Sequence, residues 1–547
     1  MRGNSRWAVF VVSLAFVLAI AHDGARSQSS PSSAAAPRLR QVAYLKASNP
    51  GAADHFACGG SLPGHIGNGI AISSDGSTLA VGAPHESSAA QGINGNQNDD
   101  SLYSAGAVYV FARRDGNWAQ QAYLKASNTG RGDNFGSLVS LSGDGNTLAV
   151  SAPWESSAAT GINGNQNDDS IPQAGAVYVF TRTGNTWSQH AYLKASNTGR
   201  PPAPGDPNDW GDGDQFGLAL ALSADGNTLA AGAITEDSLA SSINNTEFEK
   251  DDSATSSGAV YVFTRTGNTW AQQAYVKASN SGAGDLFGYG IGLSADGNTM
   301  AVAGYDEDGS GKTVNAIPDN RSNGAGAIYV FQRAASTWRQ SAYLKGSRSE
   351  RVDTLGYSVA ISEDGNTVVG GAAEETCLLP GVNPPGCDND RLPNVPSVSS
   401  GAAYVWVRNG NSWTEQAFLK ASNPGMEDWF AVRLAISGDG NTLAVGAPNE
   451  DSAAQGINGK QDDDSAQEAG AVYFFTRSGA TWTQTAYLKG SNTQAFDEFG
   501  NALALTRDGK TMALGARAED SAAKGVNGNP NDNSAPESGA AYVFDYN

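Results

Sequence analysis

Residues 133–187 read DNFGSLVSLSGDGNTLAVSAPWESSAATGINGNQNDDSIPQAGAVYVFTRTGNTW, and the chain after residue 40 repeats this text with variations. A lysine in an AYLKAS-like phrase and an aspartate in an SxDGNT-like turn each recur seven times, which gives seven units. Such recurrence indicates an array whose units bury their apolar surfaces against one another. The lysines are Lys46, Lys125, Lys194, Lys277, Lys345, Lys420 and Lys489, and the aspartates are Asp75, Asp144, Asp225, Asp296, Asp364, Asp439 and Asp508.

Each unit has the pattern of four short strands. In the unit quoted above, we expect strands at Phe135–Leu141, Thr147–Ala152, Gly175–Arg182 and Thr186–Ala195. The Asp-Gly pair between the first two is a hairpin signal. The AVYVF run is apolar at consecutive positions, and such runs belong to strands that are covered on both faces. Small sheets of four antiparallel strands that repeat radially form a β-propeller.

The two ends of the repeat array complement each other. The last unit stops on its third strand, at Tyr542–Asn547, whereas Gln41–Ala47 has the sequence of a fourth strand and precedes the first unit. Pairing these segments completes the last blade and removes an exposed sheet edge. An open solenoid, the alternative, normally shows atypical capping repeats. The prediction is an all-β, seven-bladed β-propeller over residues 41–547, closed by its N-terminal strand.

Short motifs in the units resemble the FG-GAP repeat of integrin α-subunit propellers. The motifs are Asp133-x-Phe135-Gly136 and the sequences Gly82-Ala83-Pro84 and Gly446-Ala447-Pro448. The chain is most similar to the compact form of the repeat found in exported bacterial proteins, and the resemblance covers residues 41–547. It implies the propeller fold and a role in extracellular binding or cell adhesion, without a particular chemistry.

One feature of the integrin repeats is missing. Those repeats carry an Asp-rich calcium loop between their first two strands, whereas here the connection is SGDGNT or a close variant. That turn is too short to surround a calcium ion with six or more oxygens. We therefore do not transfer the family's calcium sites to these turns, and we expect the turn aspartate to bond nearby backbone.

Charge restricts the classes of partner. The formal net charge is -21 and the pI is about 4.6. Nucleic acid and anionic lipid are recognised by clustered lysine and arginine, so neither is expected to bind. A protein or glycan at the cell surface is the expected partner, and we expect the chain to be a monomer.

Residues 1–27 have the features of an export signal. Arg2 and Arg6 precede the apolar run Trp7–Ala21, and small residues suited to cleavage follow. The run is short for a transmembrane helix, although an uncleaved anchor is the alternative. Residues 28–40, rich in Ser, Ala and Pro, have the composition of a linker. The expected location is secreted, periplasmic or cell-surface, with no membrane segment beyond the signal.

The chain has three cysteines. Cys377 and Cys387 lie in one loop and, in an oxidising compartment, are expected to form a local disulfide. Cys58 is left over, and no metal-ligand or nucleophile spacing surrounds it. A buried or idle thiol is the simpler interpretation of Cys58.

Two acidic positions recur in all seven units, one before the first strand and one after the second. Because these strands are antiparallel, both positions lie at the same end of each blade, and we expect an acidic face there. The alternative is that the carboxylates pair with the repeated lysines and cap backbone groups. The candidate binding residues are Asp133, Glu155, Asp214, Glu236, Glu307, Glu450 and Glu519.

Calcium is a candidate cofactor of the long loops. GINGNQNDDS-like sequences occur in units one, two, six and seven, which are neighbours in a closed ring. Their alternating Asn and Asp oxygens resemble the spacing of calcium ligands, and an insertion in unit three has a similar pattern. Asx turns explain the same residues without metal, and Lys460 replaces an oxygen donor in one copy. The candidate ligands are Asn94, Asn96, Asn98, Asp100, Asp206, Asn208, Asp212 and Asp214.

Catalysis finds little support in the sequence. HExxH, CxxC and GxSxG signatures are absent. His55, His65 and His85 do cluster in the first unit, where the fold could turn them into a metal site. The prediction is a non-catalytic binding or adhesion propeller. The alternatives are a carbohydrate-binding propeller, with Trp154 and Trp210 as candidate aromatics, and then a propeller hydrolase.

Overall fold

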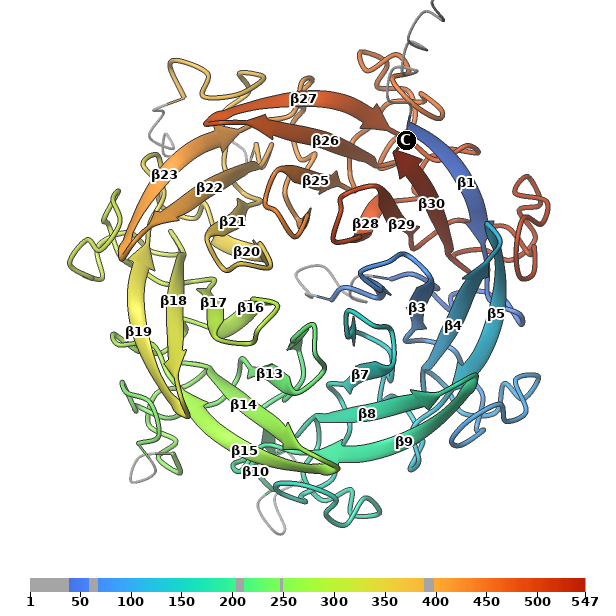
Figure 1. Ribbon diagram of the computed structural model, residues 1–547, viewed down its shortest axis with the longest axis horizontal. Helices are drawn as coiled ribbons and strands as arrows, with labels where there is room; N and C mark the ends of the chain where they lie inside the picture. Colours follow the sequence, from blue (N-terminus) through green and yellow to red (C-terminus); the bar gives the residue numbers. More distant parts are fainter. Residues whose placement is uncertain (1–38, 59–66, 203–210, 246–248, 388–397, 547) are drawn as a thin grey trace, which may run out of the picture. The chain divides into compact units, whose positions relative to one another are not determined.

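The computed structural model describes residues 39–58, 67–202, 211–245, 249–387 and 398–546. Within this part, thirty strands form seven four-stranded antiparallel sheets and one two-stranded ribbon. Figure 1 shows the sheets following one another around a ring in chain order. None of the described residues forms a helix that is long and apolar enough to cross a membrane. The predicted seven-bladed β-propeller is confirmed, while the predicted signal, residues 1–27, lies outside the described residues.

Each blade has strands A, B, C and D, from the axis to the rim. The ribbon of β10 (Gly199–Arg200) and β11 (Asp212–Gly213) extends from the connection between the second and third blades. The blades in order are β2 (Ile70–Ile72), β3 (Thr78–Ala83), β4 (Ala107–Arg114) and β5 (Asn117–Leu124); β6 (Val139–Leu141), β7 (Thr147–Ala152), β8 (Ala176–Thr183) and β9 (Thr186–Leu193); β12 (Ala219–Leu222), β13 (Thr228–Ala233), β14 (Ala259–Thr266) and β15 (Thr269–Val276); β16 (Phe287–Leu293), β17 (Thr299–Gly304), β18 (Ala327–Ala334) and β19 (Thr337–Leu344); β20 (Leu355–Ile361), β21 (Thr367–Ala372), β22 (Ala402–Asn409) and β23 (Ser412–Leu419); β24 (Arg433–Ile436), β25 (Thr442–Ala447), β26 (Ala471–Ser478) and β27 (Thr481–Leu488); and β28 (Phe499–Leu505), β29 (Thr511–Ala516), β30 (Ala540–Tyr546) and β1 (Leu39–Leu45).

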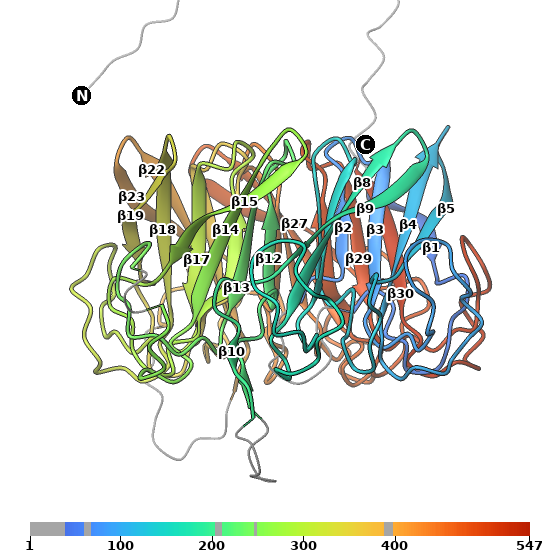
Figure 2. The same ribbon diagram turned by 90° about the horizontal axis from the view of Figure 1, so that it is seen from below.

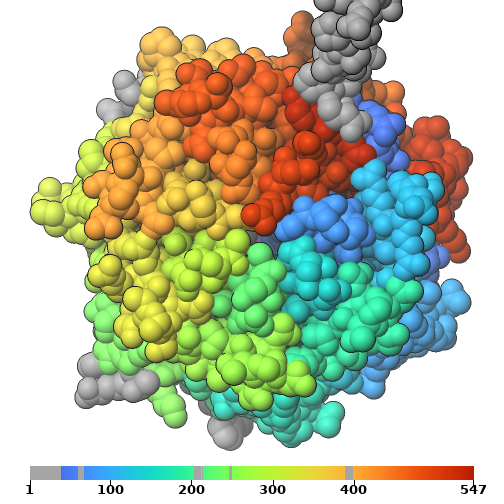
Figure 3. All heavy atoms as spheres, viewed as in Figure 1, coloured from blue at the N-terminus to red at the C-terminus, as the bar shows by residue number. Residues whose placement is uncertain are grey.

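The N-terminal strand closes the ring. β1 pairs antiparallel with β30, from Leu39 opposite Tyr546 to Leu45 opposite Ala541. Figure 1 shows β1 on the rim beside β30, and in the space-filling view the first and last blades meet (Figure 3). The seventh blade therefore contains both ends of the repeat array. β1 covers the outer edge of β30, the C strand of this blade.

The FG and GAP motifs form the contact between neighbouring blades. Gly136 of the second blade has a φ of 94°, a conformation that favours glycine. Its carbonyl oxygen lies so near Gly82 of the first blade that a Cβ added to Gly82 would be 1.9 Å from it. Phe135 is buried edge-to-face on Tyr178 and Phe180, with ring centroids 5.3 and 6.1 Å away. Glycine is thus needed where two backbones approach, and phenylalanine fills the adjoining core.

Strand A is shorter than predicted in the second blade. We expected Phe135–Leu141, but β6 covers only Val139–Leu141. Gly136 donates its N–H to the carbonyl of Ser151, and the turn at 134–137 separates it from the regular ladder. The A–B turn follows the expected chemistry, because Asp144 Oδ1 accepts hydrogen bonds from Ser142 Oγ (2.6 Å) and the Asn146 N–H (3.0 Å).

Candidate functional site

The two ends of the propeller differ in the connections that they carry. The A–B and C–D turns are short and nearly uniform, and the end where they lie is called the turn face. The B–C loops and the D–A connections between blades lie at the opposite end, which is called the loop face. Figure 2 shows short hairpin turns at one end of the strands and long loops at the other. In a rigid scaffold, the residues that bind a partner or ligand are expected on such long loops.

The repeated glutamate lies inside the blade. Glu155, at the start of the B–C loop, accepts hydrogen bonds from Lys194 Nζ at 2.8 Å and from the Tyr192 hydroxyl at 2.9 Å. The Ser157 N–H adds a third bond at 3.1 Å. The side chains of Lys194 and Glu155 are 0% and 1% exposed, and burial lowers the pKa of Lys194. The Asn128 Nδ2–H is a fourth donor, at 3.0 Å. A buried carboxylate with four donors ties strand D to the base of the B–C loop.

The same ion pair occurs in every blade. The candidate residues Asp133, Glu155, Asp214, Glu236, Glu307, Glu450 and Glu519 are at most 7% exposed. A partner that docks on the loop face therefore meets other residues. The pairs are Lys46–Glu519, Lys125–Glu86, Lys194–Glu155, Lys277–Glu236, Lys345–Glu307, Lys420–Glu375 and Lys489–Glu450.

The repeated aspartate before strand A holds the D–A connection. Asp133 Oδ2 accepts the Gly130 N–H at 2.8 Å, and the residue is 7% exposed. Burial, with the nearby negative charge of Glu155, raises the pKa of Asp133 to about 7. The equivalent residues Asp54, Asp285 and Asp428 also have a pKa of about 7, and Asp497 has one of about 8. Near neutral pH these buried aspartates of the D–A connections are therefore partly protonated.

Two of the four side chains suggested for calcium in the first blade, Asn94 and Asn96, already accept backbone hydrogen bonds. Asn94 has a φ of 54°, and its Oδ1 accepts the Tyr123 N–H at 3.0 Å. Asn96 Oδ1 accepts the Asn98 N–H at 3.1 Å, and Asp100 is exposed. In the described part of the chain, no three His, Cys, Asp or Glu side chains are grouped to hold a metal ion. Calcium at these loops stays a prediction.

The insertion of the third unit is only partly described. Asp206, Asn208 and Trp210 lie outside the described residues. Asp212 belongs to β11, and Asp214 is buried at 3% exposure. In the fifth blade, Cys377 and Cys387 are bonded in a disulfide within the B–C loop, and both are buried. Cys58, in the D–A connection before the first blade, is buried at 0% exposure.

Exposed apolar side chains gather on the loop face. Every large hydrophobic residue that is strongly exposed in the described part of the chain lies in a B–C loop or a D–A connection. Ile317 is 89% exposed and Met426 68% exposed. Tyr103 also carries the guanidinium of Arg131 over its ring, 5.9 Å from the centroid. The complete set is Tyr103, Leu239, Ile317, Leu378, Leu379, Met426 and Phe496.

Aromatic rings also cluster near the axis. Tyr289 and Tyr305 stack with centroids 4.2 Å apart, and Tyr357 meets Tyr305 edge-on at 5.7 Å. Trp429 of the following D–A connection lies 6.4 Å from Tyr357. Tyr305 and Trp429 are half-buried, so this aromatic cluster has an accessible side. Tyr289 and Tyr357 occupy the same repeat position, whereas Tyr305 and Trp429 occupy two others, and none of these positions is aromatic throughout the array.

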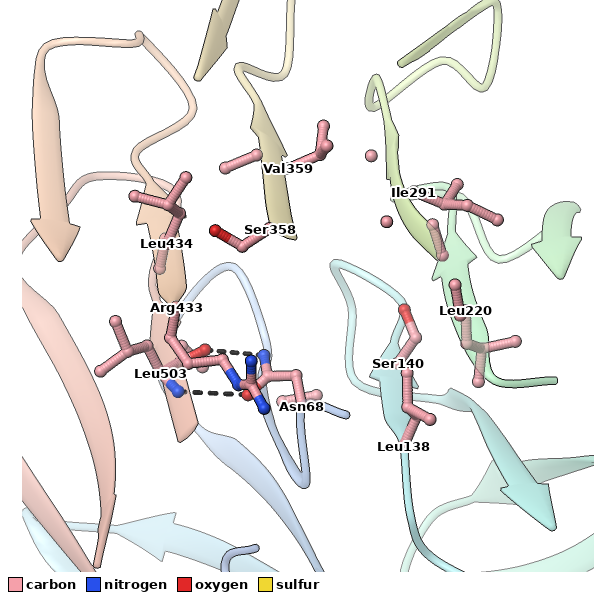
Figure 4. Close-up of a pocket in the computed structure, with 18 of the residues that line it drawn as sticks. Asn68, Leu138, Ser140, Leu220, Ile291, Ser358, Val359, Arg433, Leu434 and Leu503 are labelled. Atoms are coloured by element: carbon pink, nitrogen blue, oxygen red, sulfur yellow. Dashed lines mark hydrogen bonds between the residues drawn. The ribbon is translucent and has the colours of Figure 1, made fainter. Parts of the chain in front are cut away.

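The seven A strands line a cavity of about 350 Å³ along the axis (Figure 4). Its wall is mainly aliphatic, with Leu138, Leu220 and Ile291 among the residues drawn. Arg433 is buried at its edge, where Nε donates to the Asn501 carbonyl and Nη1 to the Val432 carbonyl, both at 2.8 Å. Burial lowers the pKa of Arg433. The sequence did not reveal this residue, because arginine replaces a neutral residue at only one of the equivalent positions.

Comparison with known proteins agrees with the architecture. A model of the FG-GAP repeat matches residues 118–180, 413–475 and 482–544. Each match runs from the tryptophan of strand D to strand C of the next blade. No curated protein sequence matches the chain.

Solved structures match the chain only at very low sequence identity and with TM-scores below 0.5. The β-propeller domain of Cps50 (Swd1) from Myceliophteria thermophila gives a TM-score of 0.46 at 9% identity, covering 93% of this chain and 99% of that one. The WD40 repeats of RRP9 give 0.43 at 8%, covering 92% and 100%. The periplasmic gluconolactonase PpgL of Pseudomonas aeruginosa gives 0.41 at 12%, covering 84% and 98%. At these values the similarities assign no activity to the chain.

Proposed function

Since this chain is a seven-bladed propeller of FG-GAP repeats, we propose that it is an exported, non-catalytic binding module. The propeller acts as a monomer, and its loop face binds a protein partner at the cell surface. The fold alone assigns no function, so the argument depends on what the loop face presents.

The observation that carries the proposal is the one-sided distribution of exposed apolar side chains. Ile317, Met426 and Phe496 are 89%, 68% and 52% exposed, and all three lie on the loop face. Exposed apolar residues scattered singly are ordinary, whereas a bias toward one face is typical of an interaction surface. Aromatic residues and methionine are also enriched in protein interfaces.

Charge suggests the chemistry of the partner. Exposed carboxylates such as Asp100, Asp169 and Asp464 lie in the B–C loops of the first, second and sixth blades, on the same face as the exposed apolar residues. A face that combines acidic and apolar side chains favours a partner whose own surface combines basic and apolar ones, because complementary charge speeds and orients association.

Two further features support export and the lack of catalysis. The Cys377–Cys387 disulfide fits an oxidising compartment, in agreement with the signal-like residues 1–27. The glutamate repeated in each blade is occupied by a buried lysine, which leaves it unsuited to acid–base work on a ligand.

The proposal is tested by capture from extracts of the native cell surface with the immobilised propeller. We expect a retained protein that is lost with the variants Ile317→Ser and Phe496→Ser and kept with Asn268→Ser, an exposed turn-face control. Retention that does not change with the loop-face variants would refute the loop face as the docking surface. So would the absence of any specifically retained protein.

Carbohydrate binding is the second candidate, favoured by the aromatic cluster. Tyr305 and Trp429 are half-buried rings near the axis, and flat aromatic faces suit the apolar side of a sugar ring. A glycan array distinguishes the two candidates. A set of related hits that disappears with Trp429→Ala would establish this second function, and an array without hits would remove it.

A further inference from the structure

Two histidines meet on the loop face of the first blade. His55 lies in the D–A connection and His85 at the end of β3, with ring centroids 4.5 Å apart and planes inclined by 42°. His55 is 8% exposed and His85 is half-buried, so the pair is accessible from the side of His85. His65, the third histidine of this unit, lies outside the described residues.

The contacts of His55 fix which ring nitrogen carries the proton. Its Nε2 lies 3.0 Å from Glu537 Oε2, so the Nε2–H donates to that carboxylate. The other nitrogen, Nδ1, is then an acceptor, and it is buried without a hydrogen-bond partner among the described residues. An orphaned buried acceptor is costly, and a metal ion would satisfy it.

Both imidazoles are held neutral, as metal ligands must be. Burial lowers the pKa of His55, and burial together with His55 lowers the pKa of His85 to about 4. Metal-bound histidines usually donate their second ring N–H to a carboxylate or a backbone carbonyl, and the Nε2–H of His55 has such a partner in Glu537.

The surrounding charges favour a cation. Arg517 faces the pair, but its guanidinium is bonded to the Glu498 carboxylate. Glu537 is the second negative charge near the pair. The positive charge of Arg517 and the negative charges of Glu498 and Glu537 together leave one net negative charge beside the two neutral rings.

The repeats show that this pair is specific to the first blade. The residues equivalent to His55 are Asn134, Gln215, Leu286, Thr354, Trp429 and Glu498, and those equivalent to His85 are Trp154, Thr235, Asp306, Glu374, Asn449 and Ala518. In the second blade the same two positions form a hydrogen bond, from Trp154 Nε1 to the Asn134 amide oxygen at 2.9 Å. In the second blade the indole N–H of Trp154 therefore supplies the donor that His55 Nδ1 lacks among the described residues of the first blade.

We propose that His55 and His85 bind one divalent transition-metal ion, such as copper(II) or zinc, with water in the remaining coordination positions. Glu537 is a positioning residue that orients His55. Imidazole nitrogens suit these metals, and copper(II) is expected to bind more tightly than zinc. Because Glu537 belongs to the last blade and the histidines to the first, the ion would also strengthen ring closure. This inference is independent of the proposed function.

The test uses the full chain and variants that copy other blades. Titration calorimetry with copper(II) and zinc should give one ion per chain, and the copper complex should show nitrogen hyperfine coupling in its electron paramagnetic resonance spectrum. His55→Asn and His85→Asn introduce the residues of the second and sixth blades and should abolish this site. Glu537→Gln, which introduces the Gln173 of the second blade, should weaken affinity by about 10–100-fold.

His190→Asn, in a rim histidine of the second blade, is the control and should bind as the wild type does. Thermal melting of each metal-free variant establishes that it is folded, and the wild type should melt at a higher temperature with zinc. Equal affinity and stoichiometry in the wild type and the folded His55→Asn and His85→Asn variants would overturn the proposal. Absence of binding by the wild type would do the same.

Discussion

Lys46 and Glu519, which lie near opposite ends of the repeat array, form a buried ion pair with Nζ and Oε2 2.7 Å apart. Tyr44 and Asn492 also donate to Glu519, each at 2.8 Å. Lys46 follows β1, and Glu519 follows β29. The pair therefore joins the N-terminal strand to the last blade with the interaction that every other blade makes within itself.

Removal of one partner should open this closure. Lys46→Ala leaves a carboxylate buried without its counterion, and breaking a buried pair in this way costs about 3–5 kcal/mol. Denaturant unfolding should show a loss of this size in the free energy of unfolding. Lys460→Ala is the control, because Lys460 is an exposed lysine near Asp462, and such pairs contribute about 0–1 kcal/mol. Equal losses in the two variants would contradict the assigned role of Lys46.

The buried Asp133 should make stability depend on pH. Its pKa is about 7 in the folded protein and near the ordinary aspartate value of 3.8 when unfolded. Between these values the folded chain retains a proton that the unfolded chain has released, so this group stabilises the fold as pH falls from 8 toward 5. Asp133→Asn, which keeps an acceptor for Gly130, should raise the melting temperature more at pH 8 than at pH 5.

Asp144→Asn is the control for this pH effect. Burial acts to raise the pKa of Asp144, but hydrogen bonds from Ser142 and Asn146 outweigh it and lower that pKa. The difference in melting temperature between this variant and the wild type should therefore be constant between pH 5 and pH 8. A constant difference for Asp133→Asn as well would rule out a titration of Asp133 in this range.

The disulfide should stabilise the B–C loop of the fifth blade. It closes a short loop, with a sequence separation of 10, and such a link contributes about 2–3 kcal/mol in the chain-entropy account. Reducing agent should lower the melting temperature of the wild type. The double variant Cys377→Ser, Cys387→Ser should melt at that lower temperature with or without reductant. A wild-type melting temperature that does not change when reductant is added would contradict this role.

Much of the fold could be predicted because its determinants repeat. The AVYVF strands, the Asp-Gly turns and the complementary strand at 41–47 led to seven blades and to the pairing of β1 with β30. The strand that was predicted least well is β6, which starts at Val139 because a turn at 134–137 separates Phe135 and Gly136 from the regular ladder. The apolar pattern of the sequence does not show this turn.

The candidate site could be predicted only in part, since recurrence does not distinguish a ligand from a structural group. Asp133 and Glu155 were placed at the correct end of the blade, but nothing in their spacing shows that Lys194 reaches Glu155 in the interior. Conversely, no other blade has a tryptophan at the position of Trp429 or an arginine at the position of Arg433. The location of these two residues near the axis is therefore visible only in the structure.

Photo-crosslinking in the native cell tests the central claim, binding through the loop face, most directly. A photoreactive phenylalanine is placed at Ile317 or Met426 on the loop face, and at Asn268 or Asn411 on the turn face, all of which are exposed. The account predicts a crosslinked protein of one defined mass from the loop-face positions and none from the turn-face positions. Crosslinking from the turn face alone, or equally from both faces, would contradict it.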